Sequence, residues 1–226
     1  MKVSISQPTL FPWIGYFDMI KECDVFVFLD NVEFKKQTWH MRNRLKNGSK
    51  IEDSEIWVHI PTKLPKTRAL IKDVLIDNNQ NWKQKHLDIF QSNYGKKYKK
   101  VSFLQELYQE DWNKIADFNI KFIAECCKYL NISTKLVLAS ELDVEGKKSQ
   151  LVLNICKQMK AAELFANNGS RDYLEEDREI FIQENIRVSY QMYTHPIYNQ
   201  RGNAFLDHLS VLDLLFSELE NSKKFI

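Results

Sequence analysis

The chain has 226 residues, of which 44% are apolar and 12% aromatic, so it is long enough to bury a substantial hydrophobic core. Its 32 basic and 30 acidic side chains leave a net charge of +2, which excludes the overall basic field that drives non-specific binding to nucleic acid. No segment approaches the run of about 18 apolar residues that spans a membrane, and the N-terminus lacks the pattern of a signal peptide.

The cysteines and histidines show no spacing typical of a disulfide framework or a metal site. Cys23, Cys126, Cys127 and Cys156 form no C-x-x-C motif, and the two adjacent cysteines would close only a strained ring with each other. The sequence therefore predicts free thiols in a reducing compartment, which means a cytoplasmic protein. It also predicts no bound metal and no cofactor.

The first thirty or so residues predict a βαβ unit. Residues 3–6 and 25–29 are short apolar runs of strand length, and residues 13–21 fit an amphipathic helix between them. Parallel strands joined in this way place ligand sites beyond their carboxyl ends. The segments that leave those ends are 7–12 and 30–36, and both are rich in functional groups.

The rest of the chain continues the mixed pattern of strands and helices. Strands are predicted at 56–60, 70–78, 135–140, 162–168 and 186–193, and helices at 78–95, 112–130, 149–160 and 209–219, the last capped by Ser210. We expect an α/β protein with a parallel-sheet, Rossmann-like core. Residues 1–226 are expected to form a single domain with a helical insertion at about 80–130.

The opening loop, Gln7 to Pro12, combines two prolines with a primary amide and is followed by an aromatic helix start. Proline after Gln7 fixes an extended exit from the strand and leaves the amide facing the predicted crevice. Gly15 allows a close approach to backbone N–H groups, although one glycine is weak evidence for a phosphate loop. Trp13 and Tyr16 have the spacing of a packed helix face as well as the chemistry of a binding surface.

A basic and aromatic segment follows the second strand of the βαβ unit. Guanidinium and ammonium groups bind phosphate oxygens, and an indole stacks on a base, so this segment suits a nucleotide. A solvated, charged loop is the alternative interpretation. The candidate residues are Asp30, Lys36, Trp39, Arg42, Asn43 and Arg44.

The segment MYTHPIYNQRGNAFLDHLS near the C-terminus is predicted to be mostly loop. His195 is held extended by the following proline, a suitable posture for a general base near neutral pH. A hydrogen-bonded structural histidine is the alternative. Tyr198, Gln200 and His208 lie on the same loop.

Several spaced motifs resemble the WbqC-like protein family. They are ISQPTLFPWIGYFDMI followed by VFVFLDNVEFKKQTWHMRNRL, then WVHIP, NNQNWKQKHL, NNGSRDYL, and HPIYNQ with LSVLDLLF. The resemblance spans almost the whole chain. The chain departs from the family where it has Asn167-Asn168-Gly169 in place of Ser-Gly, and at Asp30-Asn31 with Glu33.

The resemblance implies a role in making bacterial O-antigen or other lipopolysaccharide and surface polysaccharide. One role proposed for the family is that of a glycine transferase, which attaches a glycyl group to an amino sugar. The family supplies no settled catalytic residues to transfer to this sequence.

A weaker likeness in fold concerns the HIGH-type nucleotidyltransferases. FPWIGYFDMI lies between two strands, where those enzymes begin their phosphate-binding helix. Tyr16 occupies the position of a cationic histidine and cannot provide its charge. A nucleotidyltransferase-like core is therefore compatible with the sequence, whereas adenylyl transfer is disfavoured.

The leading hypothesis from the sequence is an aminoacyl, specifically glycyl, transferase that forms an amide on the amine of a nucleotide-linked deoxyamino sugar. Asp30 or His195 would take the amine's proton. The expected substrate-binding residues are Gln7, Trp13, Tyr16, Lys36, Trp39, Arg42, Asn43, Arg44, Gly169 and Tyr198.

The expected partners are a sugar nucleotide of the dTDP or UDP type and a glycyl donor such as glycyl-tRNA, with no membrane and no DNA. Two alternatives stay open at this point. One is a non-catalytic nucleotide-sugar binding module, and the other is a nucleotidyltransferase-like enzyme.

Overall fold

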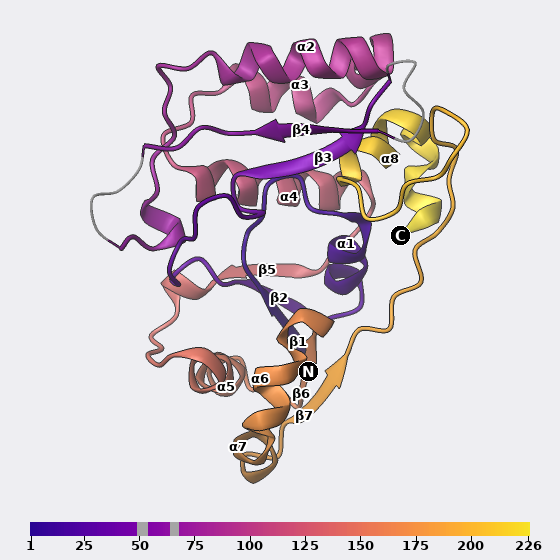
Figure 1. Cartoon of the computed structure of the whole chain (residues 1–226). Coiled ribbons are helices and arrows are strands. Elements are labelled where there is room, and N and C mark those ends of the chain that lie inside the picture. The colour runs from indigo at the N-terminus through magenta and orange to yellow at the C-terminus, as the bar shows by residue number, and fades with distance from the viewer. Residues whose placement is uncertain (49–53, 64–67) are drawn as a thin grey trace.

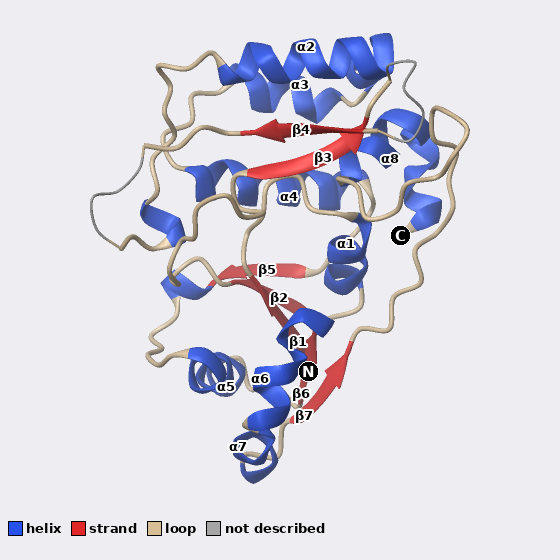
Figure 2. Cartoon of the chain, in the orientation of Figure 1, coloured by secondary structure: helices blue, strands red, loops and turns tan. Residues whose placement is uncertain are grey.

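A computed structural model describes residues 1–48, 54–63 and 68–226. A five-stranded parallel sheet lies at its centre, with the strand order β5-β2-β1-β6-β7 (Figures 1 and 2). The strands are β1 (Lys2–Ser6), β2 (Val25–Phe28), β5 (Lys135–Leu138), β6 (Glu163–Ala166) and β7 (Arg187–Tyr190). This confirms the predicted α/β fold. Because the chain runs outward from β1 to β5 and then returns to pair β6 with β1, the strand order reverses between β1 and β6.

Both faces of the sheet are covered, because successive side chains of a strand point to opposite faces. Phe26 and Phe28 of β2 enter one hydrophobic cluster, and Val25 and Val27 enter another. The first cluster includes side chains of α1 (Ile14–Lys21), α4 (Ile115–Tyr129) and α8 (Val211–Glu218). The second includes side chains of α5 (Lys148–Gln158), α6 (Arg171–Glu176) and α7 (Arg178–Gln183).

The chain between β2 and β5 contains the predicted helical insertion, preceded by a hairpin of strands. Its helices are α2 (Trp82–Tyr94), α3 (Ser102–Gln109) and α4, and the hairpin pairs β3 (Arg42–Lys46) with β4 (Glu55–His59) in antiparallel register. In Figure 1 the hairpin lies between the layer of α2 and α3 and the central sheet. Part of the basic segment, Arg42–Lys46, thus forms a strand that the sequence analysis did not predict.

The hairpin is amphipathic, with side chains alternating between its two faces. Leu45 and Val58 are fully buried on the inner face. Arg44 pairs with Trp57 on the outer face, and Arg42 lies two residues away on the same face. The strand pairing therefore gathers guanidinium and indole groups on one outward surface.

The predicted strand at 70–78 is wrong. Among the described residues this segment forms a short 3-10 turn, η1 (Ile71–Asp73), and isolated bridges rather than a strand. The amide of Ile71 donates to Val32 O and that of Ile76 to Asn113 O, so loops rather than a neighbouring strand take its hydrogen bonds. Apolar residues of this segment pack in the hydrophobic core, so their alternation with polar residues resembles that of a strand although no strand forms.

Other predicted boundaries differ by a few residues. Helix α4 begins at Ile115 rather than at residue 112, and the Lys-rich turn after α2 is a 3-10 helix, η2 (Gly95–Lys100). Gly95 ends α2 with a φ of 60°, which confirms the predicted stop. Ser210 Oγ accepts from the Leu212 amide, as predicted for the cap of α8.

A buried carboxylate of helix α8 forms hydrogen bonds that link this helix to the insertion. Asp213 is fully buried, and it accepts hydrogen bonds from the hydroxyls of Tyr94 in α2 and Tyr198 in the C-terminal loop. Burial raises the pKa of this carboxyl group. Backbone bonds from Ser210 N to Arg44 O and from Val211 N to Pro12 O join the start of α8 to β3 and to the opening loop.

The four cysteines are free and buried. Burial raises the pKa of the Cys156 thiol to about 12 and that of Cys23 to about 11, so neither is a reactive thiolate near neutral pH. In the described part of the chain, no helix is both long and apolar enough to cross a membrane.

Candidate functional site

A cleft of about 300 Å³ opens where the strand order reverses. Ser6 ends β1, Asn167 follows β6 and Gln191 follows β7, so the cleft lies beyond the carboxyl ends of the strands. Open parallel sheets bind ligands at such a switch point. The residues that line it are Ser6, Thr9, Pro12, Trp13, Gly15, Tyr16, Met19, Trp39, Asn43, Arg44, Asn167, Gln191 and His208.

The opening loop forms one wall of the cleft and is held by hydrogen bonds to its carbonyl groups. The amide of Asn119 donates to Pro8 O, and the amide of Asn43 donates to Leu10 O and Phe11 O. Both asparagines are at least 96% buried, and unmade hydrogen bonds at such depth cost about 1–3 kcal/mol each. The two prolines thus sit in a loop whose carbonyls are satisfied from outside it.

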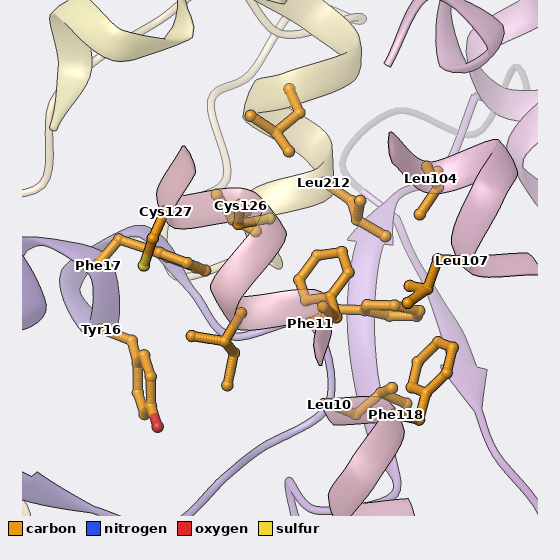
Figure 3. Packing of buried hydrophobic residues seen from close by; sticks show 14 of the residues in the cluster. Leu10, Phe11, Tyr16, Phe17, Leu104, Leu107, Phe118, Cys126, Cys127 and Leu212 are labelled. Atoms are coloured by element: carbon orange, nitrogen blue, oxygen red, sulfur yellow. The ribbon is translucent and has the colours of Figure 1, made fainter. Parts of the chain in front are cut away.

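Phe11 anchors this loop in the core. Its ring is fully buried beside that of Phe118 (Figure 3). The ring centroid of Phe11 lies 5.8 Å from that of Phe118 and 4.8 Å from that of Phe122. The residue takes a φ of 44°, a conformation that costs a non-glycine residue energy and that the packing and the Asn43 bond maintain. The buried ring and the hydrogen bonds therefore hold the opening loop in a sharp turn that forms part of the cleft wall.

Trp13 and Gly15 form the wall at the start of α1. The Trp13 indole folds over Gly15, so that a Cβ at position 15 would come within 2.2 Å of the ring. Gly15 is therefore explained by a close approach of an indole, not by a phosphate loop. Tyr16, next in the helix, lines the cleft and donates its hydroxyl to Gln7 O at 3.0 Å.

A nucleotide sugar is the ligand that the sequence analysis predicts, and with it as the probe we expect Gly15→Ala to weaken binding in the cleft by about tenfold, because the added methyl displaces the Trp13 indole from the cleft wall. Gly169→Ala is the matched control, since Gly169 is exposed and does not line the cleft. Calorimetric titration of both variants, beside a thermal melt of each, measures the effect. An equal loss in the two variants would contradict the role given to the Gly15–Trp13 contact, because Gly169 lies outside the cleft lining.

An aspartate and a histidine meet at the mouth of the cleft. His208 Nδ1 lies 3.0 Å from Asp207 Oδ1, and the imidazole stacks on the Trp13 indole with ring centroids 4.8 Å apart. The carboxylate fixes the tautomer with the proton on Nδ1. The Nε2 lone pair of a cleft-lining histidine is then available to accept a proton.

His195 lies beside this pair but does not line the cleft. Its ring centroid is 5.5 Å from that of His208, and its Nδ1 bonds to Pro196 O at 2.8 Å. Burial lowers the pKa of His195, so it is neutral near pH 7. The structure thus places His195 as a neighbour of His208, behind the cleft-lining residues.

The guanidinium of Arg44 also lines the cleft and is held in place by Glu55. Its Nη1 lies 2.8 and 3.0 Å from the two carboxylate oxygens of Glu55, a bidentate contact. The group also lies 5.5 Å above the Trp39 ring, which is half exposed. Arg44 is therefore a positioned cation, not a freely mobile one.

The cleft brings together five of the predicted binding residues and leaves the others outside. The five are Trp13, Tyr16, Trp39, Asn43 and Arg44. Asn43 uses its amide to hold the opening loop, as described above. The predicted site residues that do not line the cleft are Gln7, Asp30, Lys36, Arg42, Gly169, His195 and Tyr198.

Three of these outlying residues have evident structural partners. The Asp30 carboxylate accepts hydrogen bonds from the amide and the hydroxyl of Ser140, at 2.9 and 2.6 Å. Tyr198 donates to Asp213 at 2.7 Å. Gln7 Oε1 bonds to Nε2 of buried His40 at 2.7 Å, so part of its amide is used in holding the loop.

Sequence reasoning missed Gln191 and the pairing of Asp207 with His208. The Gln191 amide nitrogen donates to Gly15 O and to Asp18 Oδ2, at 2.7 and 2.6 Å, which leaves its oxygen as an acceptor at the cleft. In the sequence, nothing but the adjacency of Asp207 and His208 indicates that they form a pair. Within the described residues, no group of three His, Cys, Asp or Glu side chains could hold a metal ion.

The strand order and the cleft at its reversal define a doubly wound α/β protein with a candidate ligand site at the switch point. The chain belongs to the WbqC-like protein family, which it matches over residues 7–225. It is also similar to a protein of Mycobacterium tuberculosis named "Uncharacterized protein Rv1507c", with 29% identity across 96% of this chain and 93% of that protein. No solved structure gives a significant match.

Proposed function

We propose that the protein is an aminoacyl transferase that forms an amide between a glycyl group and the amine of a nucleotide-linked deoxyamino sugar. The observation that carries the proposal is that His208, paired with Asp207, lines an aromatic-rich cleft at the switch point. Family membership and the glycine-transferase role proposed for WbqC-like proteins support the same reaction. The reaction would belong to O-antigen or other surface-polysaccharide synthesis.

The chemistry needs a neutral amine, an activated carbonyl within reach and a base. The amine nitrogen attacks the ester carbonyl, so that a C–N bond forms and the C–O bond of the ester breaks. His208 Nε2 takes the proton from the nitrogen and returns it to the departing oxygen, while Asp207 stabilises the imidazolium. The Thr9 hydroxyl, which also lines the cleft, would donate to the oxyanion.

The glycyl donor is proposed to be an ester activated elsewhere, such as glycyl-tRNA. The sequence has no G-x-x-x-x-G-K-[ST] loop, and Tyr16 stands where a HIGH-type enzyme has its histidine. An ester already has the reactivity for attack by a positioned amine, so no triphosphate needs to be handled.

The test is to incubate the protein and a nucleotide-linked amino sugar with glycyl-tRNA in one tube and with glycine and ATP in another. We expect a glycylated sugar by mass spectrometry only in the first tube. Adduct formed from free glycine and ATP would refute the donor assignment. No adduct in either tube, with amino sugars that demonstrably bind, would favour the binding module, and release of pyrophosphate would favour nucleotidyl transfer.

A further inference from the structure

Two tryptophans are exposed beside the cleft, which is unusual for so large an apolar side chain. Trp39 is 48% exposed and Trp57 is 44% exposed. Their rings stack with centroids 5.9 Å apart and planes 23° apart. Trp39 comes from the loop before β3 and Trp57 from β4, so separate segments build one exposed pair of stacked indoles, which we call the ledge.

Two guanidinium groups border the ledge. The Arg42 guanidinium lies 4.7 Å from the centre of the Trp57 ring, and that of Arg44 lies 5.9 Å from the same ring. Arg44 is paired with Glu55, whereas Arg42 contacts no carboxylate in the part of the chain that the structure describes. The ledge therefore carries one uncompensated positive charge next to two indole faces.

The ledge is continuous with the cleft. Trp39 of the ledge and the bordering Arg44 also line the cleft. Trp57 and the bordering Arg42 do not line the cleft. A ligand that reacts near His208 and extends past Trp39 would thus place its far end on Trp57. That end must offer a planar face to the indoles and negative charge to the guanidinium groups.

We propose that the ledge binds the nucleoside diphosphate portion of the acceptor, with the base against the exposed part of the stacked Trp39–Trp57 pair and a phosphate at Arg42. This inference rests on the proposed function for the orientation of the ligand, because the amino sugar then reaches the Asp207–His208 pair. A second sugar ring could also stack on an indole, but a neutral saccharide would leave the Arg42 charge unmatched. The charge favours the nucleotide.

The experiment is calorimetric titration of the protein with UDP and with dTDP, which carry no sugar and so report on the ledge alone. We expect Trp57→Ala to weaken binding by about 10- to 100-fold, the usual range when a base loses its aromatic partner. Arg42→Gln is expected to weaken binding by about tenfold and to reduce its dependence on salt. Trp57→Phe keeps a ring and should retain part of the affinity.

Arg178→Gln is the matched control for charge, since Arg178 is exposed on α7 and lies outside the cleft lining. Thermal melts show whether each variant is folded. If Trp57→Ala does not fold, the affinities of Trp57→Phe and Arg42→Gln still test the proposal. Equal affinity of wild type, Trp57→Phe and Arg42→Gln for both nucleotides would overturn the proposal, as would binding of a neutral oligosaccharide but of neither nucleotide. Glycyl transfer to the sugar nucleotide in the same samples is a separate readout, because its absence bears on the proposed function and not on the ledge.

Discussion

Replacing His208 by asparagine is expected to lower kcat for glycyl transfer by about 10²- to 10⁴-fold, with little change in the affinity for the sugar nucleotide. The imidazole is the proposed proton acceptor, and its loss removes a group that acts in the transition state rather than in ground-state binding. Asparagine is chosen because His208 has a φ of 54°, which asparagine adopts more readily than most residues. The substitution therefore removes the base while keeping the backbone.

Two companion variants separate the roles of the neighbouring residues. Asp207→Asn keeps His208 but loses the carboxylate at 3.0 Å, so we expect a smaller loss in kcat together with a changed pH profile. His195→Gln alters a ring that does not line the cleft, and its effect on kcat should be much smaller than that of His208→Asn.

Steady-state kinetics across pH 5 to 9 measures all three variants, and calorimetry of the sugar nucleotide checks binding. Loss of the acidic limb of the kcat profile in His208→Asn would identify the titrating base. A large loss in His195→Gln with a small one in His208→Asn would return the base to His195. Equal activity in all three would remove histidine from the mechanism.

The sequence predicts the scaffold well because the signals of the scaffold are local. The apolar runs of β1 and β2 and the helix between them appear at strand and helix spacing, and Gly95 and Ser210 mark element ends by their own chemistry. The switch point, in contrast, depends on the long-range pairing of β6 with β1, which residue spacing in the sequence does not predict.

The candidate site is less predictable because it depends on distant partners. Asp30 has the position expected of a functional acid at a strand end, but Ser140, 110 residues away, takes its carboxylate. Asn43 appears suited to a ligand, yet its hydrogen-bonding capacity serves the opening loop. His208 has an unremarkable place in the sequence, and only the folded chain brings its ring onto Trp13 at the cleft.

Two buried histidines are expected to make the folded protein sensitive to acid. Burial lowers the pKa of His86 and of His40 from 6.5 to about 4. Both hydrogen bonds of His86 suit the neutral imidazole, because Nε2 donates to His59 O and Nδ1 accepts from the Tyr108 hydroxyl. The unfolded chain, in contrast, protonates each imidazole near pH 6.5.

The sign of the effect follows from these two pKa values. Between pH 6.5 and about 4 the unfolded state binds more protons than the folded state, so the free energy of unfolding falls as the pH falls. Each histidine contributes a slope approaching about 1.4 kcal/mol per pH unit, or about 3 kcal/mol over the window. Stability from this source is fully present above pH 6.5. The raised pKa of Asp213 acts in the opposite direction, because the folded state keeps that proton to higher pH.

His86→Gln isolates the effect of one histidine, because glutamine keeps a donor and an acceptor but does not titrate. We expect urea unfolding to give a free energy that falls less steeply with pH in this variant than in the wild type, by about 1.4 kcal/mol per pH unit between pH 6 and 4.5. The comparison cancels the term from Asp213, which both proteins share. Parallel stability curves for His86→Gln and wild type would show that His86 is protonated in the folded protein across this range, contrary to its buried pair of hydrogen bonds.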